Sequence, residues 1–374
     1  MNIEVLIEKW FERKISLERI EKYYKQLRIE KRRFLEDIDL ENIRVSCVQR
    51  QIQPVGNIEE YIDMLCGFID QAVKEGSHLV IFPEYNFFDL FGLIPEFNFL
   101  NQILNKKAIK VKDKDKDKDK DKDKDKDKDK DKEKESHLKG SNHFLTTILK
   151  GAAKPIEAGI KRIIALLAKG YGIYIYTGSY ILKEKEAIYN AGSLFGSNGN
   201  LIGTQKKIHL TDFEVKLGMK RGNKMEVYSL PFGKVVCPIC MDATYFETFR
   251  IAREIGADMV ILPIANLEEY TIWKALRGIW PRVQESYLYG LKSSLNGWIA
   301  GMHFTGKAGV FAPLLMTKKK DGILSLSSSY EGNQLISANL NLKRLYEARE
   351  KAEYHEDKNV EFEEKYIEKT YGVN

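Results

Sequence analysis

The sequence predicts an α/β fold, and three observations support this prediction. The chain opens with a strand at about 43–49, a helix from residue 58 and a buried strand at 79–82, an order typical of layered α/β proteins. Strands and helices then go on alternating to the end of the chain. With 374 residues, of which 43% are hydrophobic, the chain is also long enough to bury a sizeable core.

Residues 1–41 are expected to form an amphipathic helical extension ahead of the main domain. Ser16 is a candidate N-cap, with Glu18 in the first turn of the helix that follows. The polar face mixes both charge signs, so packing on the domain or on a partner subunit is favoured over binding to a membrane surface. The apolar residues that recur at roughly helical spacing are Leu17, Ile20, Tyr24, Leu27 and Phe34.

The main domain is expected at 42–350, followed by a C-terminal tail at 351–374. In its first strand, Ile43, Val45 and Cys47 alternate with polar side chains. The next helix begins at a capping box. Its signals are Asn57 as N-cap, Glu60 three residues later and Gly76 at its end.

Residues 112–135 are almost pure Lys-Asp alternation. The run offers no apolar side chain whose burial could offset the entropy lost on ordering. It is therefore predicted to be a low-complexity, solvated and disordered insertion in a surface loop, with a polyampholyte tether as the functional alternative.

The rest of the chain follows the same alternation of helices and strands. A helix is predicted at about 143–170, with a possible break at Pro155. The later predicted elements are strands at 173–176 and 179–182, a strand at 191–195, a turn at 197–200, strands at 201–204, 227–230 and 234–239, a helix at 245–255 ending at Gly256, a strand at 259–263, a helix at 272–289 and strands within 298–315.

Composition excludes several classes of protein. The formal net charge of +6 is modest, and basic residues are interleaved with acidic ones, so no nucleic-acid partner is predicted. Four cysteines are too few for a disulfide scaffold, which favours a reducing, cytoplasmic setting. The N-terminus does not look like a signal peptide, and no stretch approaches the roughly 18 apolar residues that span a bilayer.

Three short segments carry residues suited to catalysis. Val80 to Glu84 places a carboxylate immediately after a buried strand, at the sheet edge where α/β proteins bind ligands. Lys206 to Leu210 also follows a strand. Val236 to Asp242 is a strand that ends in a sharp turn before a helix, with Cys240 at the turn. A helix N-terminus lowers a thiol's pKa, and a nearby base and positive group would activate it further.

Taken together, these segments resemble the nitrilase, or carbon–nitrogen hydrolase, superfamily, whose members share a Glu-Lys-Cys triad in this chain order. The resemblance covers about residues 43–345. The motifs that carry it are FPE at 82–84, KKIHL at 206–210 and CMDATYFE at 240–247, with supporting matches in YNAGSLFGSNGNLIGTQKK at 189–207, GADMVILP at 256–263, RVQESYLYGLKSSLNG at 282–297 and GKAGVFAP at 306–313.

The resemblance implies a role for each matching residue. Glu84 would be the general base, Lys207 rather than Lys206 the catalytic lysine, and Cys240 the nucleophile. Glu214 would orient the triad, and the backbone N–H of Met241 would donate to an oxyanion. Relatives often have tyrosine, arginine and proline where this chain has Met241, Thr244 and Phe246. Because the triad is intact, these departures concern the substrate rather than the chemistry.

The resemblance also implies a four-layer α-β-β-α sandwich and an amidase-like hydrolase of linear amides. The expected partners are a small amide or nitrile substrate and further copies of the chain in a homodimer or higher oligomer. No cofactor or metal is expected. The alternatives are a nitrilase, an N-acyltransferase with the same triad, or a non-catalytic scaffold.

Simpler interpretations of the same residues stay open. Cys237 and Cys240 form a C-x-x-C pair, which alone would suggest a redox site or half of a zinc site. His209 is a second candidate base, although a packed structural histidine is favoured because Glu84 fills that role.

Overall fold

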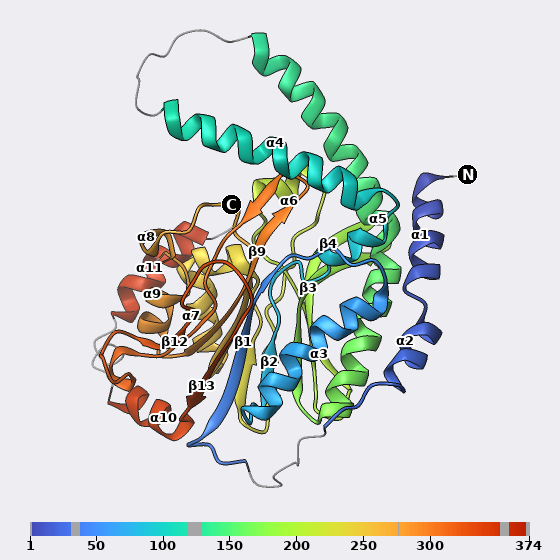
Figure 1. The fold of residues 1–374 in the computed structure, drawn as a ribbon. Helices are drawn as coiled ribbons and strands as arrows, with labels where there is room; N and C mark the ends of the chain where they lie inside the picture. The colour runs from blue at the N-terminus through green and yellow to red at the C-terminus, as the bar shows by residue number, and fades with distance from the viewer. Residues whose placement is uncertain (1, 31–37, 119–128, 276, 352–358, 372–374) are drawn as a thin grey trace.

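A computed structural model of the protein describes residues 2–30, 38–118, 129–275, 277–351 and 359–371 (Figure 1). Its strands belong to a sheet with the order β5-β4-β3-β2-β1-β9-β8-β7-β6. The strands are β1 (Ile43–Gln51), β2 (Leu79–Ile81), β3 (Tyr174–Glu184), β4 (Ala187–Phe195), β5 (Leu201–Lys206), β6 (Tyr228–Leu230), β7 (Gly233–Val236), β8 (Met259–Ile264), β9 (Tyr289–Ile299), β10 (Met302–Phe304), β11 (Gly309–Phe311), β12 (Ile323–Leu326) and β13 (Gln334–Leu340).

The helices pack on the outer faces of this sheet and at the ends of the chain. Three short 3-10 helices accompany them: η1 (Phe88–Leu93), η2 (Cys240–Thr244) and η3 (Leu314–Met316). The α-helices are α1 (Ile3–Lys14), α2 (Leu17–Tyr24), α3 (Ile58–Lys74), α4 (Phe97–Lys118), α5 (Asp129–Tyr171), α6 (Asp212–Lys216), α7 (Phe246–Glu254), α8 (Ile272–Ala275), α9 (Ile279–Ser286), α10 (Leu342–Glu350) and α11 (Val360–Tyr371).

Two parallel blocks of strands form the centre of the sheet. Strands β1, β2 and β3 are parallel, as are β9, β8 and β7. The blocks meet where β1 pairs with β9, over Gln49 to Gln51. Parallel strands need crossover connections, and α3 supplies one between β1 and β2. The carboxyl ends of neighbouring strands in each block therefore lie at one edge, which is where ligands bind in α/β sheets.

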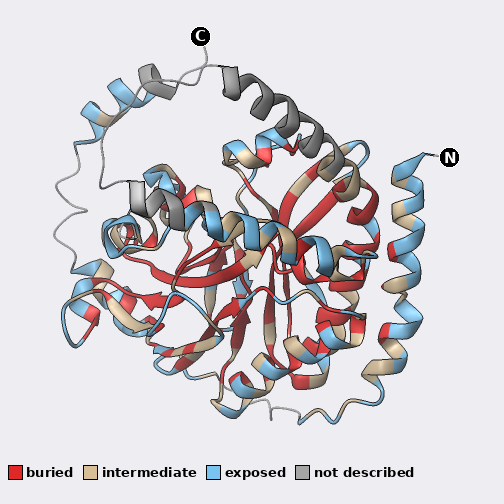
Figure 2. Ribbon diagram, turned by 45° about the horizontal axis from the view of Figure 1, so that its top comes forward, coloured by how far each residue is buried: buried red, intermediate tan, exposed pale blue. Residues whose placement is uncertain are grey.

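Three hydrophobic clusters separate four layers. One cluster joins the β1–β5 half to α3 and α5, and contains Ile69 and Ile160. A second lies between the two halves of the sheet and contains Val45 and Ile261. The third joins the β6–β9 half to α7 and α9 and contains Phe249. Figure 2 shows buried residues concentrated in the strands, with exposed residues on the outer sides of the helices. The four-layer α-β-β-α sandwich is thereby confirmed.

The N-terminal helices pack on α5, along the right-hand edge of Figure 1. Phe11 and Ile20 are fully buried, and Ser16 caps α2 as predicted by accepting a hydrogen bond from the backbone N–H of Arg19. The approach is close enough to require glycine on α5. A Cβ atom at Gly151 would lie 2.7 Å from the carbonyl oxygen of Glu4, and one at Gly159 would lie 2.2 Å from Ile15 Cγ2. The extension is thus packed on the domain.

Three expectations about individual elements need correction. Helix α5 continues through Pro155, because buried side chains on both sides of the proline, such as Ala152 and Ile156, hold it against the sheet. The single helix expected at 272–289 is instead two short helices, α8 and α9. Gly278 lies between them, and Tyr289 already begins β9. Within 298–315 the strands are the end of β9, β10 and β11, but the last of them ends at Phe311 and η3 begins at Leu314.

Both ends of the Lys-Asp run are helical rather than loop. Helix α4 extends to Lys118, and α5 begins at Asp129. Each helix continues from a segment that contains apolar residues. The centre of the run, 119–128, lies outside the described residues. Among the described helices, none is both long and apolar enough to cross a bilayer.

Candidate active site

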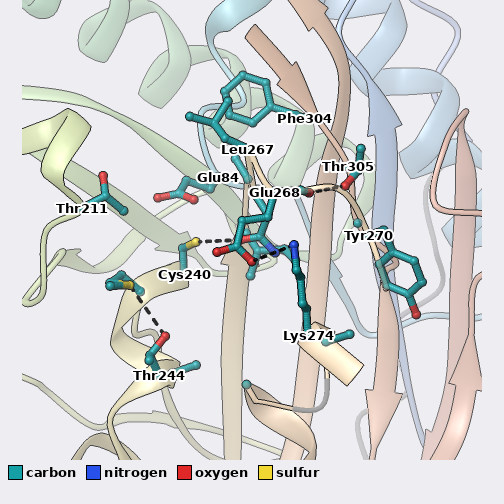
Figure 3. Close-up of a pocket in the computed structure, with 18 of the residues that line it drawn as sticks. Glu84, Thr211, Cys240, Thr244, Leu267, Glu268, Tyr270, Lys274, Phe304 and Thr305 are labelled. Carbon is teal, nitrogen blue, oxygen red and sulfur yellow. Dashed lines mark hydrogen bonds and ion pairs between the residues drawn. The ribbon is translucent and has the colours of Figure 1, made fainter. Parts of the chain in front are cut away.

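The three predicted catalytic residues come together where their strands end. Glu84 lies three residues after β2, Lys207 directly follows β5, and Cys240 begins η2 after β7. The ammonium Nζ of Lys207 lies 2.8 Å from Glu84 Oε1, and both side chains are buried. All three residues line one cavity of about 390 Å³. Figure 3 shows Glu84 and Cys240 in this cavity.

Glu214 completes the arrangement as a second carboxylate on Lys207. Its Oε2 lies 2.8 Å from Lys207 Nζ. The residue belongs to a capping box at the start of α6, in which the N–H of Thr211 donates to Oε2 at 2.8 Å. Its Oε1 accepts hydrogen bonds from the hydroxyl of Tyr85 and the amide of Asn190, each at 2.7 Å. The carboxylate is thus fixed from both sides, and it fixes the lysine in turn.

The charges of this cluster control one another's protonation. Burial raises the pKa of Glu84 above its ordinary value, and it outweighs the attraction of Lys207. Burial would lower the pKa of Lys207, but the carboxylates of Glu84 and Glu214 more than compensate and raise it. Burial would also raise the pKa of Glu214, yet the ammonium of Lys207 lowers it. Lys207 therefore stays charged, whereas Glu84 can exchange a proton.

Glu84 has one carboxylate oxygen free for this exchange. Its Oε1 accepts from Lys207 and, at 2.9 Å, from Asn190. The buried Oε2 has no hydrogen-bond partner in the described part of the chain. A buried carboxylate oxygen without a donor is costly, which is typical of a site that awaits a substrate, a water or a thiol proton.

Cys240 is held in a backbone conformation that few residues other than glycine adopt. Its φ is +46°, in the left-handed region, and Tyr85 next to Glu84 has φ +53°. The buried carboxylate of Asp242 fixes this turn by accepting the backbone N–H of Ile239 at 2.8 Å and that of His209 at 2.6 Å. It therefore ties the cysteine turn to the segment that carries Lys207.

The thiol of Cys240 is neutral in this environment. Burial and the neighbouring Glu84 carboxylate raise its pKa well above the ordinary value, while Lys207 opposes them. The Sγ lies 3.6 Å from Asn266 Oδ1, a polar contact that Figure 3 marks with a dashed line. The helix N-terminus does not lower the pKa as the sequence suggested, because burial dominates. Cys240 therefore needs a base to become a nucleophile.

The other candidate residues, His209, Lys206 and Cys237, pack or pair with neighbouring residues of the fold. His209 Nδ1 lies 3.0 Å from Asp242 Oδ1, and its ring stacks on Tyr245 with centroids 4.2 Å apart. Lys206 points away and pairs with Glu184 at 2.6 Å. Cys237 is fully buried at the end of β7, and burial raises the pKa of its thiol.

Sequence reasoning missed four residues that hold the site together. Asn190 bridges the two carboxylates, Tyr85 binds Glu214, and Asn266 contacts the thiol. Arg50 forms a buried ion pair with Asp89 that anchors the segment after Glu84. Polar side chains within otherwise apolar strands were the available signal for Asn190 and Arg50.

A model of the carbon–nitrogen hydrolase family matches residues 44–283, most of the chain. The chain therefore belongs to the carbon–nitrogen hydrolase family, as the sequence motifs predicted.

Relatives within this family are similar over part of their length. A probable hydrolase, YhcX, of Bacillus subtilis is 28% identical over 166 residues, which is 42% of this chain and 32% of that protein. Omega-amidase NIT2 of Danio rerio is 29% identical over 126 residues, 32% of this chain and 46% of that protein. The chain thus spans about a third to a half of the curated relatives it matches.

A solved structure shares the fold. The amidase from Nesterenkonia sp. superposes with a TM-score of 0.57 at 17% identity, covering 89% of this chain and 99% of that one. At this identity the likeness concerns the fold, the layered sandwich of the nitrilase superfamily.

Proposed function

We propose that the protein hydrolyses a linear, non-peptide amide through a thioester on Cys240, releasing a carboxylic acid and ammonia or an amine. The observation that carries the proposal is the cluster itself. Glu84, Lys207 and Cys240 line one cavity, the lysine bridges two buried carboxylates at 2.8 Å, and one oxygen of Glu84 lacks a partner among the described residues.

In the first half-reaction, Glu84 takes the thiol proton as Cys240 Sγ attacks the amide carbon. The oxyanion that forms is stabilised by the ammonium of Lys207 and the backbone N–H of Met241. Glu84 then gives the proton to the nitrogen, the carbon–nitrogen bond breaks, and the amine leaves. The raised pKa of Glu84 suits this role, because a general acid must hold a proton near the working pH.

In the second half-reaction, Glu84 takes a proton from water as the oxygen attacks the thioester carbon. The oxyanion forms again in the same place, and the carbon–sulfur bond breaks. Glu84 returns the proton to sulfur, which restores the neutral thiol. The sum is amide plus water giving acid plus amine, with no redox change.

Several relatives are called amidases, which supports an amide over a nitrile or acyl transfer to an amine, although one relative, of Schizosaccharomyces pombe, is called a probable nitrilase. The Danio rerio protein is called an omega-amidase, and the Nesterenkonia protein an amidase. In one solved form of the latter, the acetamide moiety of fluoroacetamide is covalently attached to the active site cysteine. These names concern those proteins, and they support the corresponding role for Cys240 here.

Assembly and setting follow from the same proposal. Helix α7 exposes the apolar residues Phe246 and Ile251, and Tyr245 just before it is also exposed, as expected of a surface that joins copies of the chain in a homo-oligomer. All four cysteines are free, which suits a reducing, cytoplasmic setting. Light scattering coupled to size exclusion measures the oligomeric state directly.

A screen of small amides, ureas and nitriles with ammonia detection tests the function. Cys240→Ala should abolish turnover of any active compound without lowering the melting temperature, while Cys237→Ala should keep most of the activity. Equal loss from both changes, together with a wild-type activity that depends on thiol oxidants or reductants, would favour the redox pair instead.

A further inference from the structure

A buried arginine lies behind the wall of the catalytic cavity, at the end of β1. Arg50 is 1% exposed, and its ion-pair partner Asp89 is fully buried. Strand β1 is parallel to β2, so its carboxyl end lies next to the turn that follows β2 and carries Glu84. The residues that line the cavity include Glu84 but neither member of this ion pair. Arg50 can therefore act on the chemistry only through other residues.

The guanidinium group of Arg50 holds the turn after Glu84 at three points. Its Nε donates to Asn86 Oδ1 at 2.7 Å, and Nη2 donates to the backbone oxygen of Asn86 at 2.8 Å. Its Nη1 pairs with Asp89, whose other carboxylate oxygen accepts the backbone N–H of Gln53 at 2.9 Å. The arginine thus fixes both the start and the end of the segment 86–89.

This turn has a conformation that needs support. Tyr85 has a φ of +53°, in the left-handed region that residues other than glycine rarely adopt. Such a conformation persists where the surrounding contacts over-determine it. The hydroxyl of Tyr85 donates to Glu214 Oε1 at 2.7 Å, while the neighbouring Glu84 pairs with Lys207. The placement of both carboxylates around Lys207 therefore depends on this turn.

Stability alone does not account for a buried ion pair at this position. Removing two charges from water is costly, and apolar side chains of similar volume often pack as well or better. A guanidinium group, however, presents its donors in a rigid planar fork, which sets direction as well as attraction. The Arg50 fork therefore supplies a defined geometry to the residues next to Glu84.

We propose that Arg50 is a positioning residue for catalysis, which acts through Asn86 and Asp89 to keep Glu84 and Tyr85 in place. This inference rests on the proposed function, in which Glu84 takes and returns the proton. A displacement of about 1 Å in such a group can slow a reaction by about 10²-fold. Loss of the fork should therefore lower kcat and leave substrate binding nearly unchanged.

Arg349 offers a matched control, because it forms a similar buried fork elsewhere in the chain. Its Nε and Nη2 donate to the backbone oxygens of Tyr287 and Ala257, both at 2.9 Å, and its Nη1 pairs with Asp258 at 2.8 Å. This fork lies at the amino end of β8, whereas the catalytic residues follow the carboxyl ends of their strands. A lysine at either position keeps the positive charge beside its aspartate but loses the planar fork.

The test compares Arg50→Lys with Arg349→Lys on an amide that the wild-type protein hydrolyses. Both changes remove hydrogen bonds from a buried arginine, so both should lower the melting temperature. Arg50→Lys should lower kcat by about 10- to 100-fold with KM within about 3-fold. Arg349→Lys should leave kcat within about 3-fold, because it does not hold a group that contacts the reacting atoms. Equal kcat values in the two variants would overturn the role of Arg50 and leave the proposed function intact.

Alkylation of Cys240 by iodoacetamide gives a second measurement that does not require amide hydrolysis. The neutral thiol needs Glu84 as its base, so the rate of alkylation depends on where Glu84 lies. Intact-protein mass spectrometry follows the reaction, and Cys240→Ala corrects for the other cysteines. Arg50→Lys should slow the alkylation by about 10-fold, and Arg349→Lys by less than about 3-fold. If no amide is turned over, the proposed function fails, and these rates decide the role of Arg50 alone.

A double-mutant cycle shows whether Arg50 acts through Glu84. In a Glu84→Gln background, Arg50→Lys should slow the alkylation by less than about 2-fold, because the two changes affect the same group. The same slowing in both backgrounds would mean a general structural loss and would overturn the proposal. If Arg50→Lys does not fold, Arg50→Met combined with Asp89→Leu takes its place, since it leaves no single charge buried. Arg349→Met combined with Asp258→Leu is then the control, with the same expected results.

Discussion

The catalytic cavity has two walls whose charges are paired differently. The first wall carries Glu84, Lys207 and Glu214, and the second is formed by β9 and the segment after β8. On the first wall, one ammonium lies between two carboxylates, and Asn190 and Tyr85 supply further hydrogen bonds. On the second wall, Lys292 of β9 forms no ion pair with any residue that the structure describes, and Glu268 forms exposed pairs with Arg277 and Lys274.

This difference separates chemistry from selection. Groups that transfer protons must keep fixed positions, because catalysis depends on atoms held close to the geometry of the transition state. Groups that choose a substrate need an unmet interaction, because a site whose polar groups are all satisfied gains little from a ligand. The changes below should therefore act differently on the two walls.

The largest contrast should come from removing the base. Glu84→Gln keeps the shape and the hydrogen bond from Asn190 but cannot accept the thiol proton, so acylation should slow by about 10²- to 10⁴-fold. Any thioester that forms should persist, and intact-protein mass spectrometry would show the added acyl mass. Glu268→Gln, on the second wall, should cost less than about 10-fold, since an exposed pair contributes little.

The acid limb of the pH profile adds a direct check on Glu84. Since the carboxylate form is the active base and burial raises its pKa, kcat/KM should fall with decreasing pH already above 4.5, the ordinary value for glutamate. A variant Glu84→Gln that forms and clears the acyl-enzyme at the wild-type rate would remove Glu84 from the mechanism and leave His209 as the next candidate.

The next contrast is between neighbouring lysines. Lys207→Ala removes an oxyanion partner and should lower kcat by about 10²- to 10³-fold. Lys206→Ala breaks a pair with Glu184 that lies outside the cavity and should change the rate by less than about 2-fold. Steady-state kinetics on both variants, with melting temperatures to establish folding, would show a larger loss at Lys206 if the assignment were off by one residue.

A smaller effect is expected on stability. Glu214→Gln keeps the side-chain shape but leaves Lys207 with one carboxylate, so unfolding should become easier by about 1–3 kcal/mol. Asp212→Asn, on the same helix but exposed, should change stability by less than about 0.5 kcal/mol. Urea denaturation of the two variants measures the difference, and equal midpoints would mean that Glu214 does not hold the lysine.

The smallest effect lies outside both walls. Replacing 113–135 by a short Gly-Ser linker should leave activity nearly unchanged, because the run carries no apolar residue other than at its borders. Lys112 is kept, since its Nζ lies over the ring of Trp298 at 5.3 Å. A marked loss of activity or melting temperature would show that the run docks on the protein.

The first wall could be predicted from the sequence and the second could not. Glu84, Lys207 and Cys240 lie in short motifs next to strands, so their residue types and positions after strand ends were readable. The partners of Glu214, by contrast, come from residues as distant as Tyr85, and only the fold brings them within 2.7 Å. Lys292 was hidden because a single lysine in an apolar run indicates nothing by itself.

Local signals also failed where packing overrode them. Pro155 removes a donor from α5, yet the helix continues because its buried face is held along the sheet. The helix expected at 272–289 ended early, because the chain must turn at Gly278 to bring Tyr289 into β9. Helical periodicity gave no indication that the pattern changes to a strand there.

The close seat of α1 and α2 on α5 has a practical consequence for anyone who shortens the chain. Gly151 and Gly159 have no side chain, and this allows Glu4 and Ile15 to approach the backbone of α5 closely. Without α1 and α2, these two positions no longer need glycine. A version that starts at residue 42 would expose to water the surface of α5 on which α1 and α2 pack. Such a truncation would leave an exposed apolar helix surface, which promotes aggregation during expression.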